Sequence, residues 1–301
     1  MRISTAKKVT APKLAAAGAS VAIAGTLLGV GLANTATAAT AAPATTAASH
    51  ASTMSARTAV KPTIVLVHGA WADNSSWNAV VEELQARGYT VDVPPNPLRG
   101  VTEDANYLSD FLSTISGPIV LVGHSYGGFV ITQAATGNHQ VKALVYDDAF
   151  IPAAGDTPMT LSGAKPGSCL AVKDPTTVLN FAPFPMAAKG DADVYVKQSV
   201  FPGCFANSLP AREGEALAAE QQPLALSALN EKLTVAPAWK TIPSWAVIGT
   251  ADHVIPPAEQ VVMSHRAKAH VTEIKGAPHL SMISDPRAVT EVILNAAHSA
   301  G

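Results

Sequence analysis

Short apolar runs recur along this 301-residue chain from residue 63 onward, and segments with helical spacing of apolar residues lie between them. Six runs are rich in apolar and β-branched residues, as expected of strands in a parallel sheet that helices cover on both faces. They are Thr63–Val67, Tyr89–Val93, Ile119–Val122, Val141–Tyr146, Trp245–Ile248 and His270–Ile274. Strands and helices that alternate through short links predict an α/β fold with a mostly parallel central sheet and right-handed crossovers.

Two of the intervening helices can be bounded from the sequence. The first is predicted over Trp77–Arg87, because apolar residues recur there at helical spacing and Gly88 follows as a typical stop. The second is predicted to start at Thr102, whose hydroxyl can cap the first turn. Its expected buried face carries Tyr107, Leu108, Phe111 and Leu112.

The first forty or so residues have the composition of an export signal. A cationic start leads into a weakly apolar stretch, and Ala36-Thr37-Ala38 fits a signal-peptidase site. We expect residues 1–38 to be a signal peptide of the general secretory route, because no Arg-Arg pair precedes the apolar stretch. The protein would then be secreted and keep no membrane anchor; a transmembrane anchor is the alternative. Residues 39–60, rich in Ala, Thr and Ser, are interpreted as a disordered linker.

The remaining residues, 61–301, suffice for one α/β domain with a sizeable core. The 22 acidic and 20 basic residues give a formal net charge of −2, and no basic run lies outside the signal. Nucleic acid is therefore not expected as a partner. No Cys and His cluster has the spacing of metal ligands, and no Gly-rich loop has a phosphate-binding context. Neither a metal nor another cofactor is expected.

The segment around Ser125 is the most informative motif in the chain. The apolar run Ile119–Val122 leads into Gly123-His124-Ser125-Tyr126-Gly127, and an apolar helical pattern follows. Strand, tight turn and helix form the context of a nucleophile elbow, in which glycines avoid collisions around a strained serine. The helix also directs the positive end of its dipole to the place where an oxyanion would form. Ser125 is the candidate nucleophile, and a plain strand-to-helix turn is the alternative.

A serine nucleophile needs a base, and the base needs a group that orients it. On such a sheet the partners follow in the order serine, acid, histidine. Asp252 follows the fifth predicted strand and His279 follows the sixth. Both are expected at the carboxyl edge of the sheet, where Ser125 also lies. Asp147 and Asp148, at the end of the fourth strand, are the alternative acids.

Acyl transfer also requires N–H donors for the oxyanion. The residue after the nucleophile, Tyr126, is expected to supply one backbone N–H, and the loop after the first strand the other. That loop begins His68-Gly69-Ala70. Because Gly69 lets the backbone turn toward the site, the N–H of Ala70 is the predicted second donor.

Residues 151–237 interrupt the alternation of strands and helices with many prolines and scattered aromatic residues. A helical pattern is visible only around residues 212–233. We interpret this insertion as a lid over the site, with an excursion packed away from the site as the alternative. Cys169 and Cys204 lie within it, and in an exported protein a disulfide is favoured over two buried thiols. The bond would close a loop of about 35 residues and contribute roughly 3–4 kcal/mol in the chain-entropy model.

Taken together, these motifs resemble the α/β-hydrolase superfamily. The likeness is carried by the run from Val65 to Ala70 with Trp77 further on, by the Ser125 elbow, by Asp252 and by His279. It spans roughly residues 62–297 and is strongest to small serine esterases related to the plant methylesterase and hydroxynitrile-lyase branch. It implies an α/β-hydrolase fold with a mostly parallel sheet, helices on both faces and an inserted lid.

The resemblance also implies a Ser125–His279–Asp252 triad with Ala70 and Tyr126 as oxyanion donors. Leu280 stands where the hydroxynitrile lyases carry a lysine that helps to stabilise cyanide. Hydrolysis of a small-molecule carboxylic ester is therefore the expected reaction. Two alternatives stay open: another reaction on the same machinery (lyase, acyltransferase or cofactor-free haloperoxidase), and a non-catalytic binding protein.

Overall fold

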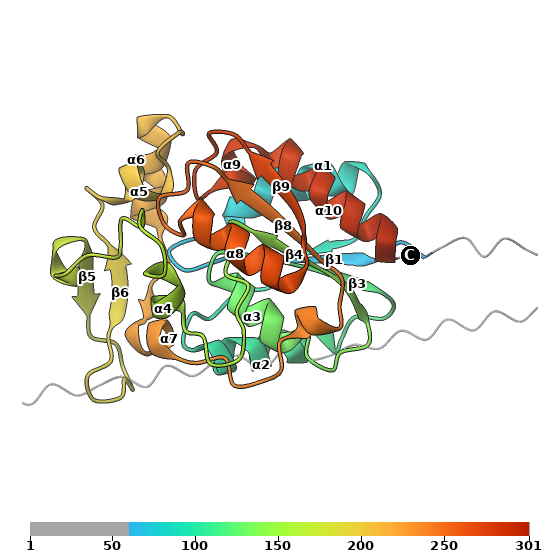
Figure 1. Cartoon of the computed structure of the whole chain (residues 1–301), viewed down its shortest axis with the longest axis horizontal. Coiled ribbons are helices and arrows are strands. Elements are labelled where there is room, and N and C mark those ends of the chain that lie inside the picture. The colour runs from blue at the N-terminus through green and yellow to red at the C-terminus, as the bar shows by residue number, and fades with distance from the viewer. Residues whose placement is uncertain (1–59, 301) are drawn as a thin grey trace, which may run out of the picture. The chain divides into compact units, whose positions relative to one another are not determined.

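A six-stranded, fully parallel sheet forms the centre of the protein (Figure 1). The computed structural model describes residues 60–300, so the predicted signal peptide and all of the predicted linker except Val60 lie outside the described residues. The strand order is β2-β1-β3-β4-β8-β9. The strands are β1 (Thr63–Val67), β2 (Val91–Asp92), β3 (Ile119–His124), β4 (Val141–Asp147), β8 (Ser244–Gly249) and β9 (His270–Ile274). The predicted α/β fold with a parallel sheet is confirmed.

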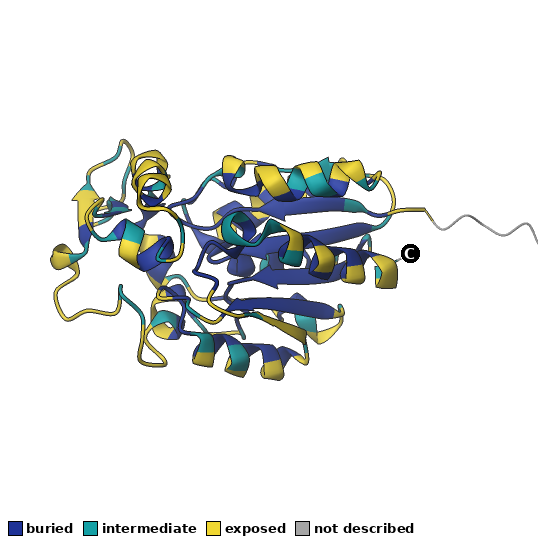
Figure 2. Ribbon diagram, turned by 90° about the horizontal axis from the view of Figure 1, so that it is seen from above, coloured by how far each residue is buried: buried dark blue, intermediate teal, exposed yellow. Residues whose placement is uncertain are grey.

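Helices cover both faces of this sheet (Figure 1). On one face α1 packs against α10, and on the other α2 packs against α3, while α8 contacts β8. The bounds are α1 (Asn78–Ala86), α2 (Val101–Leu112), α3 (Gly127–Ala134), α8 (Pro257–Ala267), α9 (Ser281–Ser284) and α10 (Pro286–Ala300), with a short 3₁₀ helix, η1 (Asn74–Trp77), before α1. Helices α1, α2 and α10 each bury a stripe of mainly apolar residues and expose residues on the opposite side (Figure 2).

Burial differs between the central and the outer strands. Every residue of β3 and β8 is buried, and β1 and β4 each have one residue that is not (Figure 2). By contrast, four of the five residues of β9 are exposed. Helices cover both faces of the sheet as predicted, but they bury the edge strand β9 less than the inner strands.

The segment between β4 and β8 carries a second, three-stranded antiparallel sheet in the order β5-β6-β7. We call residues 151–237 the cap segment. Its elements are α4 (Pro158–Ser162), η2 (Pro175–Thr177), β5 (Leu179–Ala182), β6 (Asp193–Val196), α5 (Phe201–Phe205), α6 (Ala211–Glu220), β7 (Leu224–Ala225) and α7 (Leu226–Asn230); η3 (Ala238–Lys240) follows it. A disulfide joins Cys169 to Cys204, whose Cα atoms are 5.9 Å apart.

The predicted helical stretch over residues 212–233 is wrong in its middle part. Helix α6 ends at Glu220, β7 follows, and α7 starts only at Leu226. Pro223 lacks an N–H and cannot continue the hydrogen bonding of α6. The Gln221 side chain instead pairs with both backbone groups of Val196 in β6, at 2.8 and 2.9 Å, which ties this stretch to the small sheet.

The cap segment is attached to the loops that follow β1 and β2. The Trp71 indole N–H donates to the Val194 carbonyl (2.8 Å), and its backbone N–H donates to the Gln222 carbonyl (3.0 Å). Arg99 forms an ion pair with Asp193 of β6 at 2.7 Å. Because these contacts join the small sheet to the loop that contains Ala70, the cap segment is anchored beside the candidate site.

The N-terminus of helix α2 is capped by a side chain from a distant part of the chain. The predicted capping role of Thr102 is wrong, because the helix starts at Val101 with Gly100 as its N-cap. The Glu231 carboxylate accepts hydrogen bonds from the N–H groups of Val101 (2.7 Å) and Thr102 (2.9 Å). Tyr107, expected on the buried face, is 44% exposed.

Candidate active site

Ser125 lies on the turn between β3 and α3 with a positive φ of 52°. A side chain is strained in this region, and only close packing on both sides keeps such a residue there. A Cβ atom at Gly123 would come within 2.7 Å of the Gly127 carbonyl oxygen, and one at Gly127 within 2.8 Å of the Val67 carbonyl oxygen. Both positions therefore require glycine, as the elbow motif predicts.

Three distant side chains meet at the carboxyl edge of the sheet. His279 Nε2 lies 2.9 Å from Ser125 Oγ, and His279 Nδ1 lies 2.8 Å from Asp252 Oδ2. Asp252 follows β8, and His279 follows β9. The structure thus brings together the nucleophile, base and acid candidates of the sequence in the order that proton transfer from the hydroxyl requires.

Asp252 is surrounded by hydrogen-bond donors. Its Oδ1 accepts from the N–H groups of Val254 (2.7 Å) and Ile255 (3.0 Å), and its Oδ2 accepts from Gln260 Nε2 (2.7 Å). Burial raises the pKa of Asp252 to about 8, and these three hydrogen bonds offset only part of that rise. Because all of these partners are donors, they orient the carboxyl group to accept the Nδ1–H of His279. Sequence reasoning missed Gln260, because no motif marks a glutamine on the following helix.

His279 is fully buried, and burial lowers its pKa below the ordinary value of 6.5. The neutral imidazole is the form that can accept a proton from a hydroxyl. The ring of Phe205, from the cap segment, stands edge-on to the imidazole with 5.2 Å between centroids. His124 Nε2 donates to the backbone carbonyl of His279 at 2.8 Å, so this residue supports the base loop. We call residues 275–280 the base loop and residues 250–256 the acid loop.

The alternative acids, Asp147 and Asp148, pair with other groups. Asp147 Oδ1 accepts from the Ser281 hydroxyl (2.8 Å), and Asp147 Oδ2 is buried with no partner among the described residues. Asp148 Oδ1 accepts from Gly249 N (2.6 Å), and its Oδ2 from Ser281 N (3.2 Å). Gly249 precedes the acid loop and Ser281 follows the base loop. Asp148 therefore holds both loops in place without contacting the imidazole.

Both carboxyl groups are fully buried, and this burial raises their pKa values well above the ordinary range. The charge of Asp148 raises the pKa of Asp147 further, and that of Asp252 raises the pKa of Asp148. Asp148 also has a positive φ of 43°, which is a strained conformation for an aspartate. Sequence reasoning singled out the two residues but did not find their role in tying Gly249 and Ser281.

The predicted oxyanion donors lie next to Ser125 in the same pocket. Within residues 60–300, the N–H groups of Ala70 and Tyr126 donate no hydrogen bond to another residue, so both can bind an oxyanion. The Tyr126 hydroxyl donates to Asp104 Oδ2 (2.8 Å), which fixes the ring. Burial raises the pKa of Asp104 to about 6. Asp104 is another residue that the sequence did not indicate, since an acidic residue in a first helical turn is usually exposed.

A pocket extends from Ser125 to the cap segment and contains about 660 Å³ of space that protein atoms do not fill. No residue among the described ones that line it carries a charged side chain. The larger apolar side chains in its wall are Trp71, Phe150, Met159, Leu170, Leu179, Leu224 and Leu229. The cap segment supplies five of these seven, so it forms part of the pocket that opens onto Ser125.

Residues 60–300 contain no group of three or more His, Cys, Asp or Glu side chains placed to hold a metal ion. None of the helices in this part of the chain combines the length and the apolar character needed to cross a bilayer.

Comparison with known proteins identifies the fold family. A family model described as alpha/beta hydrolase family matches residues 64–292. The chain belongs to the alpha/beta hydrolase family. The resemblance inferred from the motifs is thereby confirmed, and the catalytic residues of this family member stay a prediction that the geometry supports.

Curated relatives of this alpha/beta hydrolase include two enzymes with named substrates. A carbendazim hydrolyzing esterase from Nocardioides sp. is 36% identical over 112 residues, which are 32% of this chain and 46% of the relative. A pyrethroid hydrolase from Sphingobium wenxiniae is 37% identical over 111 residues, which are 32% of this chain and 39% of the relative. Both matches span less than half of the relative's length.

Solved structures of the family cover nearly the whole fold. Polyneuridine aldehyde esterase superposes with a TM-score of 0.65 at 18% identity, covering 78% of this chain and 99% of that one. Tomato methylketone synthase I gives a TM-score of 0.65 at 19% identity, covering 80% and 100%. A pyrethroid hydrolase from Sphingobium faniae gives 0.61 at 22% identity, covering 79% and 97%. At these identities the likeness establishes the fold alone.

Proposed function

We propose that this alpha/beta hydrolase is a serine esterase that cleaves carboxylic esters through an acyl-enzyme intermediate. The observation that carries the proposal is the continuous chain of hydrogen bonds from Ser125 through His279 to Asp252, with spacings of 2.9 and 2.8 Å. The relatives named as an esterase and a hydrolase support the same reaction class. The complete set of three side chains argues against a binding protein that has lost its chemistry.

In the proposed mechanism His279 Nε2 accepts the proton of Ser125 as the Ser125 Oγ attacks the ester carbonyl carbon. Asp252 keeps the proton of the imidazole on Nδ1 and stabilises the imidazolium that forms. The carbonyl oxygen becomes an oxyanion that accepts hydrogen bonds from the N–H groups of Ala70 and Tyr126. His279 then protonates the leaving alcohol. Water, deprotonated by the same imidazole, hydrolyses the acyl-enzyme and releases the acid.

The pocket favours an ester with an uncharged, apolar group. Among the described residues, those that line it are uncharged, and the Tyr126 hydroxyl is already bound to Asp104. A charged substrate group would lose its hydration in this pocket without gaining a partner, which is costly. The proposed substrates are therefore neutral small-molecule esters rather than charged metabolites.

Export is part of the same proposal. It rests on the cationic start, the apolar stretch and the small-residue site at residues 36–38. Expression of the full chain in a secreting host should yield protein in the medium whose N-terminus follows Ala38. Retention of the unprocessed chain in the cells would contradict export and leave the catalytic proposal standing.

A fluorophosphonate probe and p-nitrophenyl acetate together test the reaction. The wild-type protein should be labelled and should hydrolyse the ester, whereas Ser125→Ala should resist labelling and lose at least about 10⁴-fold in kcat with its fold intact. Full activity of Ser125→Ala would end the proposal. Product analysis with and without an acceptor alcohol separates hydrolysis from acyl transfer.

A further inference from the structure

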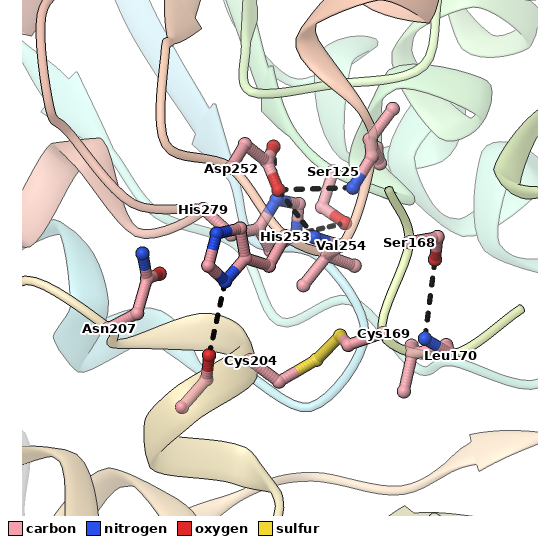
Figure 3. Close-up of a disulfide and its surroundings, with 12 residues drawn as sticks. Ser125, Ser168, Cys169, Leu170, Cys204, Asn207, Asp252, His253, Val254 and His279 are labelled. Carbon is pink, nitrogen blue, oxygen red and sulfur yellow. Dashed lines mark hydrogen bonds and ion pairs between the residues drawn. A yellow bond between two sulfur atoms is a disulfide. The ribbon is translucent and has the colours of Figure 1, made fainter. Parts of the chain in front are cut away.

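The Cys169–Cys204 disulfide joins two stretches of the cap segment that both contact the acid loop (Figure 3). On one side, the backbone N–H of Cys169 donates to the His253 carbonyl at 2.7 Å. On the other side, His253 Nδ1 donates to the carbonyl of Gly203, the neighbour of Cys204 in α5, at 3.3 Å. The residue directly after Asp252 is therefore held from both ends of the bridge.

The residue directly before Asp252, Ala251, is also held by the cap segment, from a position just after α5. Asn207 follows α5, and its side-chain Nδ2 donates to the Ala251 carbonyl at 3.0 Å. The backbone carbonyls of Ala251 and His253, the residues on either side of Asp252, thus accept hydrogen bonds from the cap segment, while the Asp252 carboxylate points to the imidazole of His279. A shift of α5 would act on the acid loop through both contacts.

The bridged stretches also reach the base and the pocket. Phe205, next to Cys204, packs edge-on against His279 and stacks on Phe201 with 4.6 Å between centroids. Leu170 follows Cys169 and forms part of the pocket wall beside Ser125. One covalent bond therefore connects the segment that lines the pocket with the helix that contacts both the acid loop and the imidazole.

We propose that the Cys169–Cys204 bridge positions the Asp252 loop and the pocket wall, so that its reduction slows catalysis in a protein that stays folded. This inference rests on the proposed function. Without the bond, the two stretches would be held against the acid loop by noncovalent contacts, among them the hydrogen bonds to Ala251 and His253. A displacement of about 1 Å in a catalytic group can cost on the order of 10²-fold in rate. A bridge that only restricts the unfolded chain would change stability and leave the kinetics of the folded protein unaltered.

Dithiothreitol provides the direct test, since it donates two electrons to the bridge, leaves two protein thiols and becomes a cyclic disulfide itself. We expect reduction of the wild-type protein to lower kcat for p-nitrophenyl acetate by about 10- to 100-fold. The KM for p-nitrophenyl octanoate should rise more than that for the acetate, because Leu170 is displaced. Thiol titration verifies reduction, and circular dichroism verifies that the protein is folded at the assay temperature.

The double variant Cys169→Ser/Cys204→Ser is the matched control for the reductant. It should be as slow as the reduced wild-type protein and should not respond to dithiothreitol. If reduction and the double variant lower the melting temperature while kcat and both KM values stay at wild-type levels, the bridge is only a stabilising link and the inference is overturned.

A second variant keeps the test decisive if loss of the bridge unfolds the protein. Asn207→Leu removes the hydrogen bond to Ala251 but leaves the disulfide intact, and it should lower kcat about 3- to 10-fold, in line with the loss of one positioning contact. Asn180→Leu is its control, because Asn180 lies exposed in β5 of the same cap segment. Equal and wild-type kcat values in the two variants would refute the positioning role.

The outcome for the oxidised wild-type protein separates the two proposals. If it hydrolyses esters and reacts with a fluorophosphonate while reduction changes nothing, the esterase stands and the role of the bridge falls. If it neither reacts with the probe nor hydrolyses any ester, the proposed function fails and this inference falls with it.

Discussion

The central sheet and the cap segment hold their residues in place by different means. The inner strands β1, β3, β4 and β8 are almost entirely buried and pair with their neighbours over much of their length. The strands of the cap segment have two to four residues, and it relies on a disulfide and on side-chain bonds to loops of the core. The proposed reacting groups all follow strands of the sheet, while the cap segment forms much of the pocket wall. The comparison suggests that the sheet fixes the chemistry and the cap segment sets which substrates enter.

The largest loss of activity should come from replacing Asp252, the proposed acid, which follows β8 of the central sheet. Asp252→Asn leaves an amide that cannot hold the correct tautomer of His279, and kcat should fall by about 10⁴-fold, as for other triads. Asp148→Asn should cost far less, about 10- to 100-fold, because Asp148 holds loops and does not contact the imidazole. Steady-state kinetics on one p-nitrophenyl ester compare the two. An active Asp252→Asn beside an inactive Asp147→Asn or Asp148→Asn would show that the acid assignment is wrong.

A change in the cap segment should instead alter selectivity. Gly163 lines the pocket, and a Cβ atom there would meet only the Met159 carbonyl oxygen, at 3.7 Å. Gly163→Leu therefore adds bulk to the pocket without backbone strain. Since each buried methylene is worth about 0.8 kcal/mol, kcat/KM for p-nitrophenyl octanoate should fall by about 10- to 100-fold. Hydrolysis of the acetate should change little.

The control for that variant is Ala216→Leu, which adds the same side chain at an exposed position of α6. It should behave as wild type on both esters. If Gly163→Leu and Ala216→Leu have the same ratio of octanoate to acetate activity, the pocket between Ser125 and the cap segment is not where the longer chain binds.

The pH dependence of kcat/KM tests how burial changes the pKa of His279. His279 must be neutral to act as a base, and burial lowers its pKa from 6.5. The acid limb of kcat/KM should therefore fall at a lower pH than that of an ordinary histidine, and activity should persist below pH 6.5. Samples returned from each pH to neutral buffer before assay separate protonation from unfolding. If the acid limb of kcat/KM gave an apparent pKa of 6.5 or higher, burial would not lower the pKa of His279.

The smallest effect is expected where the two regions join. Glu231→Ala removes the carboxylate that binds the N–H groups of Val101 and Thr102 and should cost about 1 kcal/mol. For a domain of this size the melting temperature should then fall by about 2–4 °C. Glu82→Ala, at an exposed position of α1, serves as the control. A shared shift in both variants would mean that Glu231 makes no special contribution.

Sequence reasoning located strands and candidate site residues where the signal is local. The run before Ser125, the glycines around it and the placement of Asp252 and His279 after strands can all be seen in short stretches of the chain, and the structure brings these residues together. What it missed depends on contacts between distant segments. Gln260 acquires its role only when α8 packs beside Asp252, and Asp148 only when the two loops meet.

The cap segment was predicted least well for the same reason. Its strands are short, and their pairing is set by partners such as Gln221 with Val196 rather than by a repeating apolar pattern. The break between α6 and α7 and the capping of α2 by Glu231 likewise depend on residues far apart in the chain. An apolar period detects elements that pack along their whole length, and the cap segment has few of these.

The burial of Asp147 and Asp148 should affect the stability of the folded protein in alkaline solution. Folding raises the pKa values of Asp147 and Asp148 above their ordinary value of 3.8, so the native state binds protons that the unfolded chain releases. Their contribution to the free energy of unfolding is fully present below that value and is lost as the pH rises through the raised pKa values. By its own contribution, the acidic pair that ties two loops together makes the native state more stable in acid than in alkali, whereas the buried histidines His68, His124 and His279, whose pKa values burial lowers, contribute in the opposite sense.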